Sequence, residues 1–178
     1  MSVQQIIFGL LEFLVSILIS FVLIFGSYRL LLVLSPRFDE ERQLKKKNIS
    51  VGIVLGGILL GEAVVVKQAL YPVMAVIQLF VIGQEKNFGN FAMALLYSLG
   101  YVLIAGVLAI ACIFFSFWMF NRLTPRINQY QEIQDNNIAI ALFMALFIIA
   151  ICLLMSSGVS GLVRALIPFP EIGSVPLE

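Results

Sequence analysis

Four long apolar stretches constrain the fold of this chain more than any other feature of its sequence. Each reaches or exceeds the roughly 20 residues that a helix needs to cross the hydrocarbon core of a bilayer. Hydrocarbon offers no partner to backbone amides and carbonyls, so a spanning segment must pair them internally as a helix. The sequence therefore predicts an all-α polytopic membrane protein with four transmembrane helices. The predicted spans lie at about 6–34, 49–70, 91–120 and 138–163.

The composition agrees with this class of protein. Hydrophobic residues make up 61% of the 178 residues and charged residues 12%, whereas soluble domains average roughly 45–50% and about 25%. Too few polar residues remain to cover a water-soluble globule. The net charge of +1 gives no basic excess that would favour nucleic acid. We therefore expect membrane lipids as partners and no nucleic acid.

The sequence lacks the residue patterns of common catalytic and metal sites. There is no histidine, and the two cysteines, Cys112 and Cys152, each lie inside an apolar stretch. Without a nucleophile and base pair, a phosphate-binding loop or a metal triad, we expect no enzyme, no cofactor and no metal ion. The predicted topology puts Cys112 toward the cytoplasmic side and Cys152 toward the outer half. We therefore expect two buried thiols and no disulfide between them.

Lysine and arginine determine the predicted orientation, because short loops rich in these residues stay in the cytoplasm. The segments 35–48 and 123–136 hold most of the cations near the spans, and only Lys86 and Arg164 appear on the opposite side. Both segments should face the cytoplasm, which leaves both chain termini outside. We therefore expect a multi-pass protein of the inner (plasma) membrane. The cations of the first segment are Arg37, Arg42, Lys45, Lys46 and Lys47.

The apolar sequence continues beyond the second predicted span. A helix from Ile49 to Ile82 would be about 50 Å long, which exceeds a hydrocarbon core of about 30 Å. Pro72 has no amide hydrogen to donate and is unfavourable inside a helix. We therefore expect the helix to kink or end there, and residues 72–82 to form a short interfacial or re-entrant segment on the outer face.

The chain also aligns with itself at a shift of 89 residues. This shift brings Ser35-Pro36-Arg37 onto Thr124-Pro125-Arg126, and Asn48 onto Asn137. The two asparagines are predicted to cap the helices that follow them. Because each unit holds two spans, the two helical-hairpin repeats should have parallel orientation. The predicted parts are repeat units at 1–82 and 91–167, a short outer loop at 83–90 and an extended tail at 168–178.

The residues of these repeats resemble a known bacterial family. Ser35 to Glu40 and the glycine-rich stretch from Asn48 to Gly61 look like the membrane family named domain of unknown function 350. Its units start with Thr-Pro, continue with Gly-Asn-x-Ala-x-Ala and then carry Gly-Gly-x-x-x-Gly. Thr124-Pro125 and Asn137-Ile138-Ala139-Ile140-Ala141 match the first two patterns in the second unit, which lacks the glycines. The resemblance implies a small inner-membrane protein often linked with envelope stress, without an established activity or catalytic residues.

Glu62 is the most informative single residue, because it lies about 20 Å into the second span. A carboxylate at that depth is costly unless it faces protein, water or a partner. Either it forms a structural hydrogen bond, or the second helices of several subunits present it as an acidic ring to cations. Lys67 is predicted to reach the outer interface or to pair with Glu12 of the first span. Ser156 and Ser157 would line the same path or bond within their helix.

Four glycines on the second span predict close helix contacts. Small residues spaced four apart let two backbones approach in a membrane. The contact would lie within one chain or between subunits of a homo-oligomer. The glycines are Gly52, Gly56, Gly57 and Gly61.

Two functions are compatible with these features. The first is a small oligomeric ion channel or transport pore that uses Glu62 as its intramembrane acid. The alternative is a non-conducting structural or envelope-stress subunit that recruits a cytoplasmic protein. The basic residues of 35–48 would then contact either anionic lipids or that partner.

Overall fold

The protein folds into helices and short connections. The computed structural model describes residues 3–34, 40–82 and 88–166, and this part of the chain contains no strand. The prediction of an all-α protein is confirmed. The helices are α1 (Val3–Leu34), α2 (Glu40–Lys45), α3 (Ile49–Ile82), α4 (Phe88–Leu123), α5 (Gln129–Gln134) and α6 (Ile138–Leu166).

Three of the helices are long and apolar enough to cross a membrane. Their candidate spans are Ile49–Gln78 in α3, Phe88–Leu123 in α4 and Ile138–Val163 in α6. Large apolar side chains also cover the outer surface, among them Leu103 at 67% and Leu154 at 78% exposure. Exposed apolar side chains in this number are typical of a surface that contacts lipid. The chain is therefore a membrane protein.

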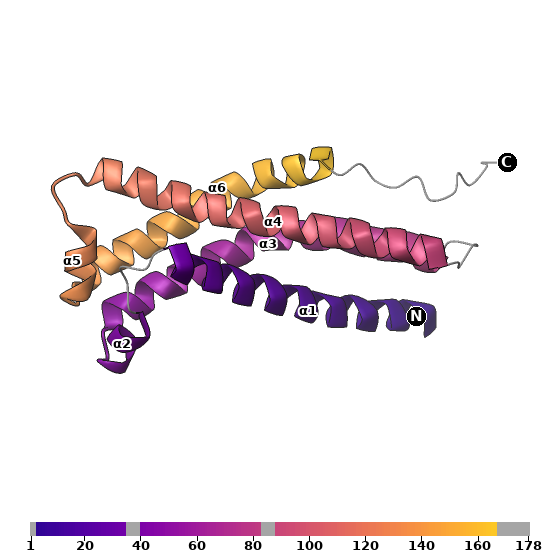
Figure 1. Cartoon of the computed structure of the whole chain (residues 1–178), viewed down its shortest axis with the longest axis horizontal. Coiled ribbons are helices and arrows are strands. Elements are labelled where there is room, and N and C mark those ends of the chain that lie inside the picture. The colour runs from indigo at the N-terminus through magenta and orange to yellow at the C-terminus, as the bar shows by residue number, and fades with distance from the viewer. Residues whose placement is uncertain (1–2, 35–39, 83–87, 167–178) are drawn as a thin grey trace.

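The helices form an elongated bundle with its two short helices at one end (Figure 1). α2 and α5 lie at that end, whereas the start of α1 and the end of α6 lie toward the other. α3 contacts each of the other long helices and packs most extensively against α6 and then α4. α3 is thus the central helix, and half of its span is buried.

The structure corrects the prediction for residues 72–82. α3 runs without interruption from Ile49 to Ile82 with Pro72 inside it, so no separate re-entrant segment forms there. Pro72 is fully buried, Val73 is 1% exposed and Val76 is 0% exposed. Packing against neighbouring helices therefore outweighs the single backbone hydrogen bond that proline removes. The length of the helix is compatible with a membrane, because a long helix can tilt across the core.

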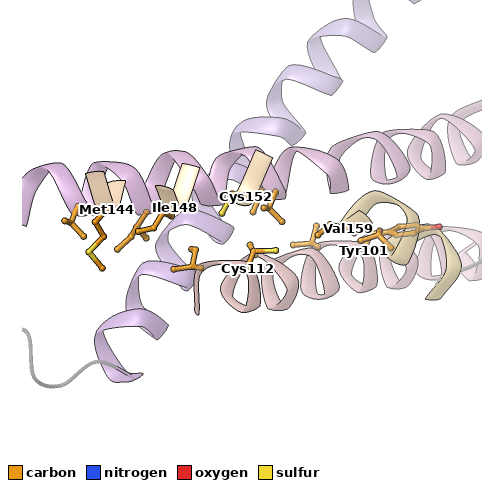
Figure 2. Packing of buried hydrophobic residues seen from close by; sticks show 14 of the residues in the cluster. Tyr101, Cys112, Met144, Ile148, Cys152 and Val159 are labelled. Atoms are coloured by element: carbon orange, nitrogen blue, oxygen red, sulfur yellow. The ribbon is translucent and has the colours of Figure 1, made fainter. Parts of the chain in front are cut away.

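The core is a narrow seam of side chains between α3, α4 and α6 (Figure 2). Aliphatic residues dominate it, and Tyr101 of α4 is its largest fully buried side chain. Cys112 of α4 and Cys152 of α6 lie on facing helices within this seam. The residues labelled in Figure 2 are Tyr101, Cys112, Met144, Ile148, Cys152 and Val159.

Each short helix leads into the following long helix through the same local geometry. α2 ends before Lys47 with φ 60°, and α5 ends before Asn136 with φ 61°. The next residue is an asparagine in both cases, and its backbone amide donates a hydrogen bond back to the short helix. Asn48 donates to the Gln43 carbonyl at 3.1 Å, and Asn137 donates to the Glu132 carbonyl at 2.9 Å. The two turns therefore coincide at the 89-residue shift seen in the sequence.

Candidate functional site

Glu62 lies inside the protein, on the central helix α3. Its side chain is 0% exposed, as completely buried as Val51 and Val65 of the same helix. It follows Ile49, the first residue of α3, by about 20 Å along the helix axis. An acid at this depth lies well inside the apolar span Ile49–Gln78. Glu62 is therefore the central residue of the candidate site.

The turn of α3 that carries Glu62 is also the place where α3 meets α6. A Cβ atom added at the adjacent Gly61 would lie 3.0 Å from Cys152 Sγ and 3.2 Å from Ile148 Cγ2. One turn earlier, a Cβ atom at Gly57 would lie only 2.6 Å from Ala145 Cβ. Glu62 is thus held in a segment whose backbone is fixed by close contact with a second helix.

This burial changes the interpretation of Glu62 as an acidic ring between subunits. The side chain is covered within one chain, so copies that meet through their outer surfaces would not bring it to a shared axis. The intersubunit ring stays a prediction, and the burial of Glu62 within one chain does not favour it. Helices α1, α4 and α6 all pack against α3. Any path that reaches Glu62 has to pass between helices of the same chain.

Two further charged residues were predicted to act within the spans. Lys67 is exposed on α3, so the prediction that it snorkels to the outer interface stays open. Glu12 belongs to α1, but the structure does not describe its side chain, so its predicted pairing with Lys67 stays a prediction.

Two adjacent serines of α6 differ in their surroundings. Ser156 is 8% exposed, and its hydroxyl donates to the Leu153 carbonyl at 2.7 Å, within its own helix. Ser157 is exposed on the outside of α6. A local bond of this kind uses the only hydrogen that a serine hydroxyl can donate. The geometry thus gives Ser156 a local role and puts Ser157 on the outer surface.

The four glycines of α3 divide into two pairs. Gly57 and Gly61 touch α6, as the short Cβ distances above show. Gly56 would have no atom within 4 Å of an added Cβ, and Gly52 would have only Leu44 Cδ2 at 3.8 Å. The first pair therefore permits packing inside one chain, which is one of the two uses that the spacing allowed.

The two cysteines meet in the core, which the sequence reasoning did not foresee. Both are buried and free, and the Cys152 thiol lies close enough to interact with Cys112 and with Ser116. The expectation that they lie at different depths is therefore wrong. Counting residues from the ends of α4 and α6 at about 1.5 Å each would have given nearly the same depth for both. The Ser116 hydroxyl itself donates to the Cys112 carbonyl at 2.7 Å.

The asparagines at the helix starts form a polar cluster at the end of the bundle that carries α2 and α5. Asn48 Oδ1 accepts from the Val51 amide at 3.1 Å, and Asn137 Oδ1 accepts from the Ile140 amide at 3.4 Å. Asn48 also reaches the other half of the chain, because its Nδ2 donates to the Ile133 carbonyl at 2.9 Å. Both residues thus act as N-caps, and Asn48 has the additional role of joining α3 to α5.

Asn136 completes this cluster and was missed from the sequence. Its Oδ1 accepts from the Ser50 amide at 3.0 Å, so it caps α3 from the opposite half of the chain. An asparagine in the short turn between two helices is the sequence signal that could have found it, because asparagine tolerates positive φ better than most residues.

The basic residues of the predicted cytoplasmic loop lie at the same end of the bundle. Arg42, Lys45, Lys46 and Lys47 are exposed on or just after α2, whereas Arg37 lies outside the described residues. These four cations surround the start of α3 with positive charge. The exposed side chains of Lys45, Lys46 and Lys47 can reach lipid headgroups or a protein partner.

Comparison with known proteins identifies a family and nothing narrower. A search of curated proteins and a search of solved structures each give no match. A family model matches residues 5–159, which covers most of the chain, including Glu62 and both asparagine caps. The chain therefore belongs to the family described as Domain of Unknown Function (DUF350).

Proposed function

We propose that this protein is a small ion-conducting or ion-transporting membrane protein, in which Glu62 is the charge that a proton or small cation meets inside the bilayer. The observation that carries the proposal is the complete burial of Glu62 within an apolar span. Intramembrane acids are costly, and they commonly mark proton relays and ion pathways.

The surroundings of Glu62 on α3 support this reading. Ile58, Val65 and Ala69 share its buried stripe at helical spacing and are 7%, 0% and 0% exposed. An aliphatic residue at position 62 would fit this stripe without the cost of burying a carboxyl group. We therefore assign the carboxyl group at this position to proton or cation binding.

We further propose that α1 is a fourth membrane span. α1 has 32 residues, so it is long enough to cross a hydrocarbon core of about 30 Å. Its apolar stretch Phe13–Gly26 supports this assignment. Four spans would place both termini on the outer face of a bacterial inner membrane, opposite the basic segment around α2.

The recurrence of the short-helix turns supports two parallel repeat units in this proposal. Lys47 and Asn136 share a positive φ, and Asn48 and Asn137 share backbone and capping bonds. Lys47 matches Asn136, and Asn48 matches Asn137, at a shift of 89 residues. Two helical hairpins that cross the membrane in the same sense would follow from this arrangement.

Copies of the chain would associate through α6 in this proposal. Ser157, Gly158 and Gly161 are exposed on α6, and added Cβ atoms at the two glycines would meet nothing within 4 Å. A neighbouring helix could approach such a surface closely. The ion path would remain inside each chain, because Glu62 is buried there.

Ion flux through purified protein in liposomes tests the proposal. Wild-type protein should dissipate a proton or potassium gradient, and Glu62→Gln should reduce the rate by at least tenfold. Glu41→Gln is the matched control, because Glu41 is an exposed acid on α2 and its loss should leave flux unchanged. Absence of flux from folded wild-type protein with every monovalent cation and with protons would contradict the proposal.

A second candidate is a non-conducting subunit that recruits a cytoplasmic protein. The observation that favours it is the exposed charge of Arg42, Lys45, Lys46 and Lys47 at one end of the bundle. Under this alternative, wild-type protein conducts nothing, and replacing these cations abolishes capture of the partner while Glu62→Gln has no effect.

A further inference from the structure

A shallow groove of about 410 Å³ opens where α2 meets α3. Apolar side chains form most of its wall, with Lys47 and Asn48 at the turn between the two helices. Asn48 is already engaged with Ile133 and Val51, so Lys47 is the polar side chain left to face a ligand. The groove is lined by Leu44, Lys47, Asn48, Ile49, Gly52 and Ile53.

The groove lies at the level where the chain enters the membrane. The apolar span of α3 begins at Ile49, and Ile49 is itself 56% exposed. Ile49, Gly52 and Ile53 continue the groove from the turn into the span. One end of the groove is therefore at headgroup depth, and the other end is in the acyl-chain region.

Gly52 keeps the groove open. A Cβ atom at this position would find only Leu44 Cδ2 in contact, at 3.8 Å. A single methyl group would fit, but a longer side chain would extend into the space between α2 and α3. Gly52 thus differs from Gly57, where Ala145 already fills the space that a Cβ atom would need.

The charge at this turn is not needed for its backbone shape. Lys47 has φ 60°, and the matching residue of the second turn, Asn136, has φ 61°. Asparagine accepts a left-handed backbone more readily than lysine does. The second turn also carries Gln134 and Asp135 where the first carries Lys45 and Lys46. The first turn therefore carries three lysines, whereas the second turn has the same backbone geometry and no cation at the matching positions.

We propose that this groove binds one anionic phospholipid. Lys47, with Lys45 and Lys46 beside it, would hold the phosphate of the headgroup. One acyl chain would lie along Ile49, Gly52 and Ile53. Charge complementarity supports this occupant, because lysines at a bilayer surface are attracted to anionic lipid headgroups. The second turn has Asp135 and Asn136 in the matching places, so it lacks the cations that would hold the phosphate.

Native mass spectrometry of the full chain, released from bilayers that mix phosphatidylglycerol and phosphatidylcholine, tests this proposal. Wild-type protein should retain phosphatidylglycerol at least fivefold over phosphatidylcholine, with one lipid in the most abundant bound species. Lys47→Asn should remove this preference. That variant places the residue of the second turn in the first, so the turn itself should still form.

Two further variants separate a specific site from general charge attraction. Gly52→Leu keeps every cation but fills the groove, and should reduce phosphatidylglycerol retention at least fivefold. Arg126→Asn removes an exposed cation after α4 and should leave retention unchanged. The proposal is overturned if Lys47→Asn and Gly52→Leu retain the lipid as wild type does, or if Arg126→Asn loses it to the same extent. Ion flux plays no part in this readout, so the result is independent of the role proposed for Glu62.

Discussion

The side-chain amide of Asn48 donates a hydrogen bond to the backbone carbonyl of Ile133 at 2.9 Å, across 85 residues of sequence. The same nitrogen donates to the Gln134 carbonyl at 3.1 Å, while Oδ1 accepts from the Val51 amide. One buried side chain thus caps the start of α3 and joins it to the end of α5. The two halves of the chain are fixed to one another at the end of the bundle that carries the basic residues.

Replacing Asn48 by alanine should therefore destabilise the protein. The variant loses an N-cap and the side-chain donor to the Ile133 carbonyl, which still accepts from the Asn136 amide at 3.2 Å. These losses together should lower the free energy of unfolding by about 1–3 kcal/mol. Asn137→Ala is the matched control, because Asn137 is only half-buried and its capping bond is 3.4 Å long. Its loss should cost below about 1 kcal/mol. Denaturant titration in mixed micelles measures both values, and equal losses would contradict the special role of Asn48.

Adding one methyl group at Gly57 should disturb the contact between α3 and α6. The new Cβ would lie 2.6 Å from Ala145 Cβ and 2.7 Å from Ala145 Cα, and backbone cannot move aside as a flexible side chain can. Gly57→Ala should therefore reduce stability by about 1–3 kcal/mol. At Gly56 there is no atom within 4 Å of the new Cβ, so Gly56→Ala should match or exceed wild-type stability because alanine favours helix. Thermal unfolding of the two variants in one detergent compares them, and similar melting temperatures would count against the contact.

Spin labels placed singly at residues 71–78 should reveal a continuous helix beyond Pro72. Tyr71 and Gln78 are exposed, whereas Val73, Met74 and Val76 are buried. Collision rates with oxygen should follow this pattern and repeat with the helical period of about 3.6 residues. The background would carry serine in place of both native cysteines. A flat profile would instead indicate a re-entrant segment. A steady rise along the segment in collision rates with a water-soluble relaxation agent would indicate the same.

Helix type and the membrane class could be predicted from the sequence, because long apolar runs leave the backbone few alternatives in hydrocarbon. The position of Pro72 inside a continuous helix could not be predicted from the sequence. Its effect depends on how tightly Val73 and Val76 pack against neighbouring helices, and this packing involves residues far away in the chain. Local propensity and tertiary burial opposed one another here, and burial was the larger effect.

The candidate site shows the same division. The depth of Glu62 followed from counting residues along one helix, but its burial within a single chain depends on how the neighbouring helices pack against α3. The link from Asn48 to Ile133 was also outside the reach of sequence patterns. The 89-residue shift identified both asparagines as equivalent, yet only one of them has a partner in the other half of the chain among the hydrogen bonds described.

The most direct test of the central claim compares Glu62→Gln with Glu62→Asp in proton and cation flux across liposomes. Glutamine keeps the shape of the side chain and removes its ionisable group, whereas aspartate keeps the group on a shorter stem. If the acid carries the ion, Glu62→Gln should lose at least tenfold in rate, while Glu62→Asp should retain a substantial part of the wild-type rate. Equal flux in wild type and Glu62→Gln, with both proteins folded to the same extent, would contradict the account.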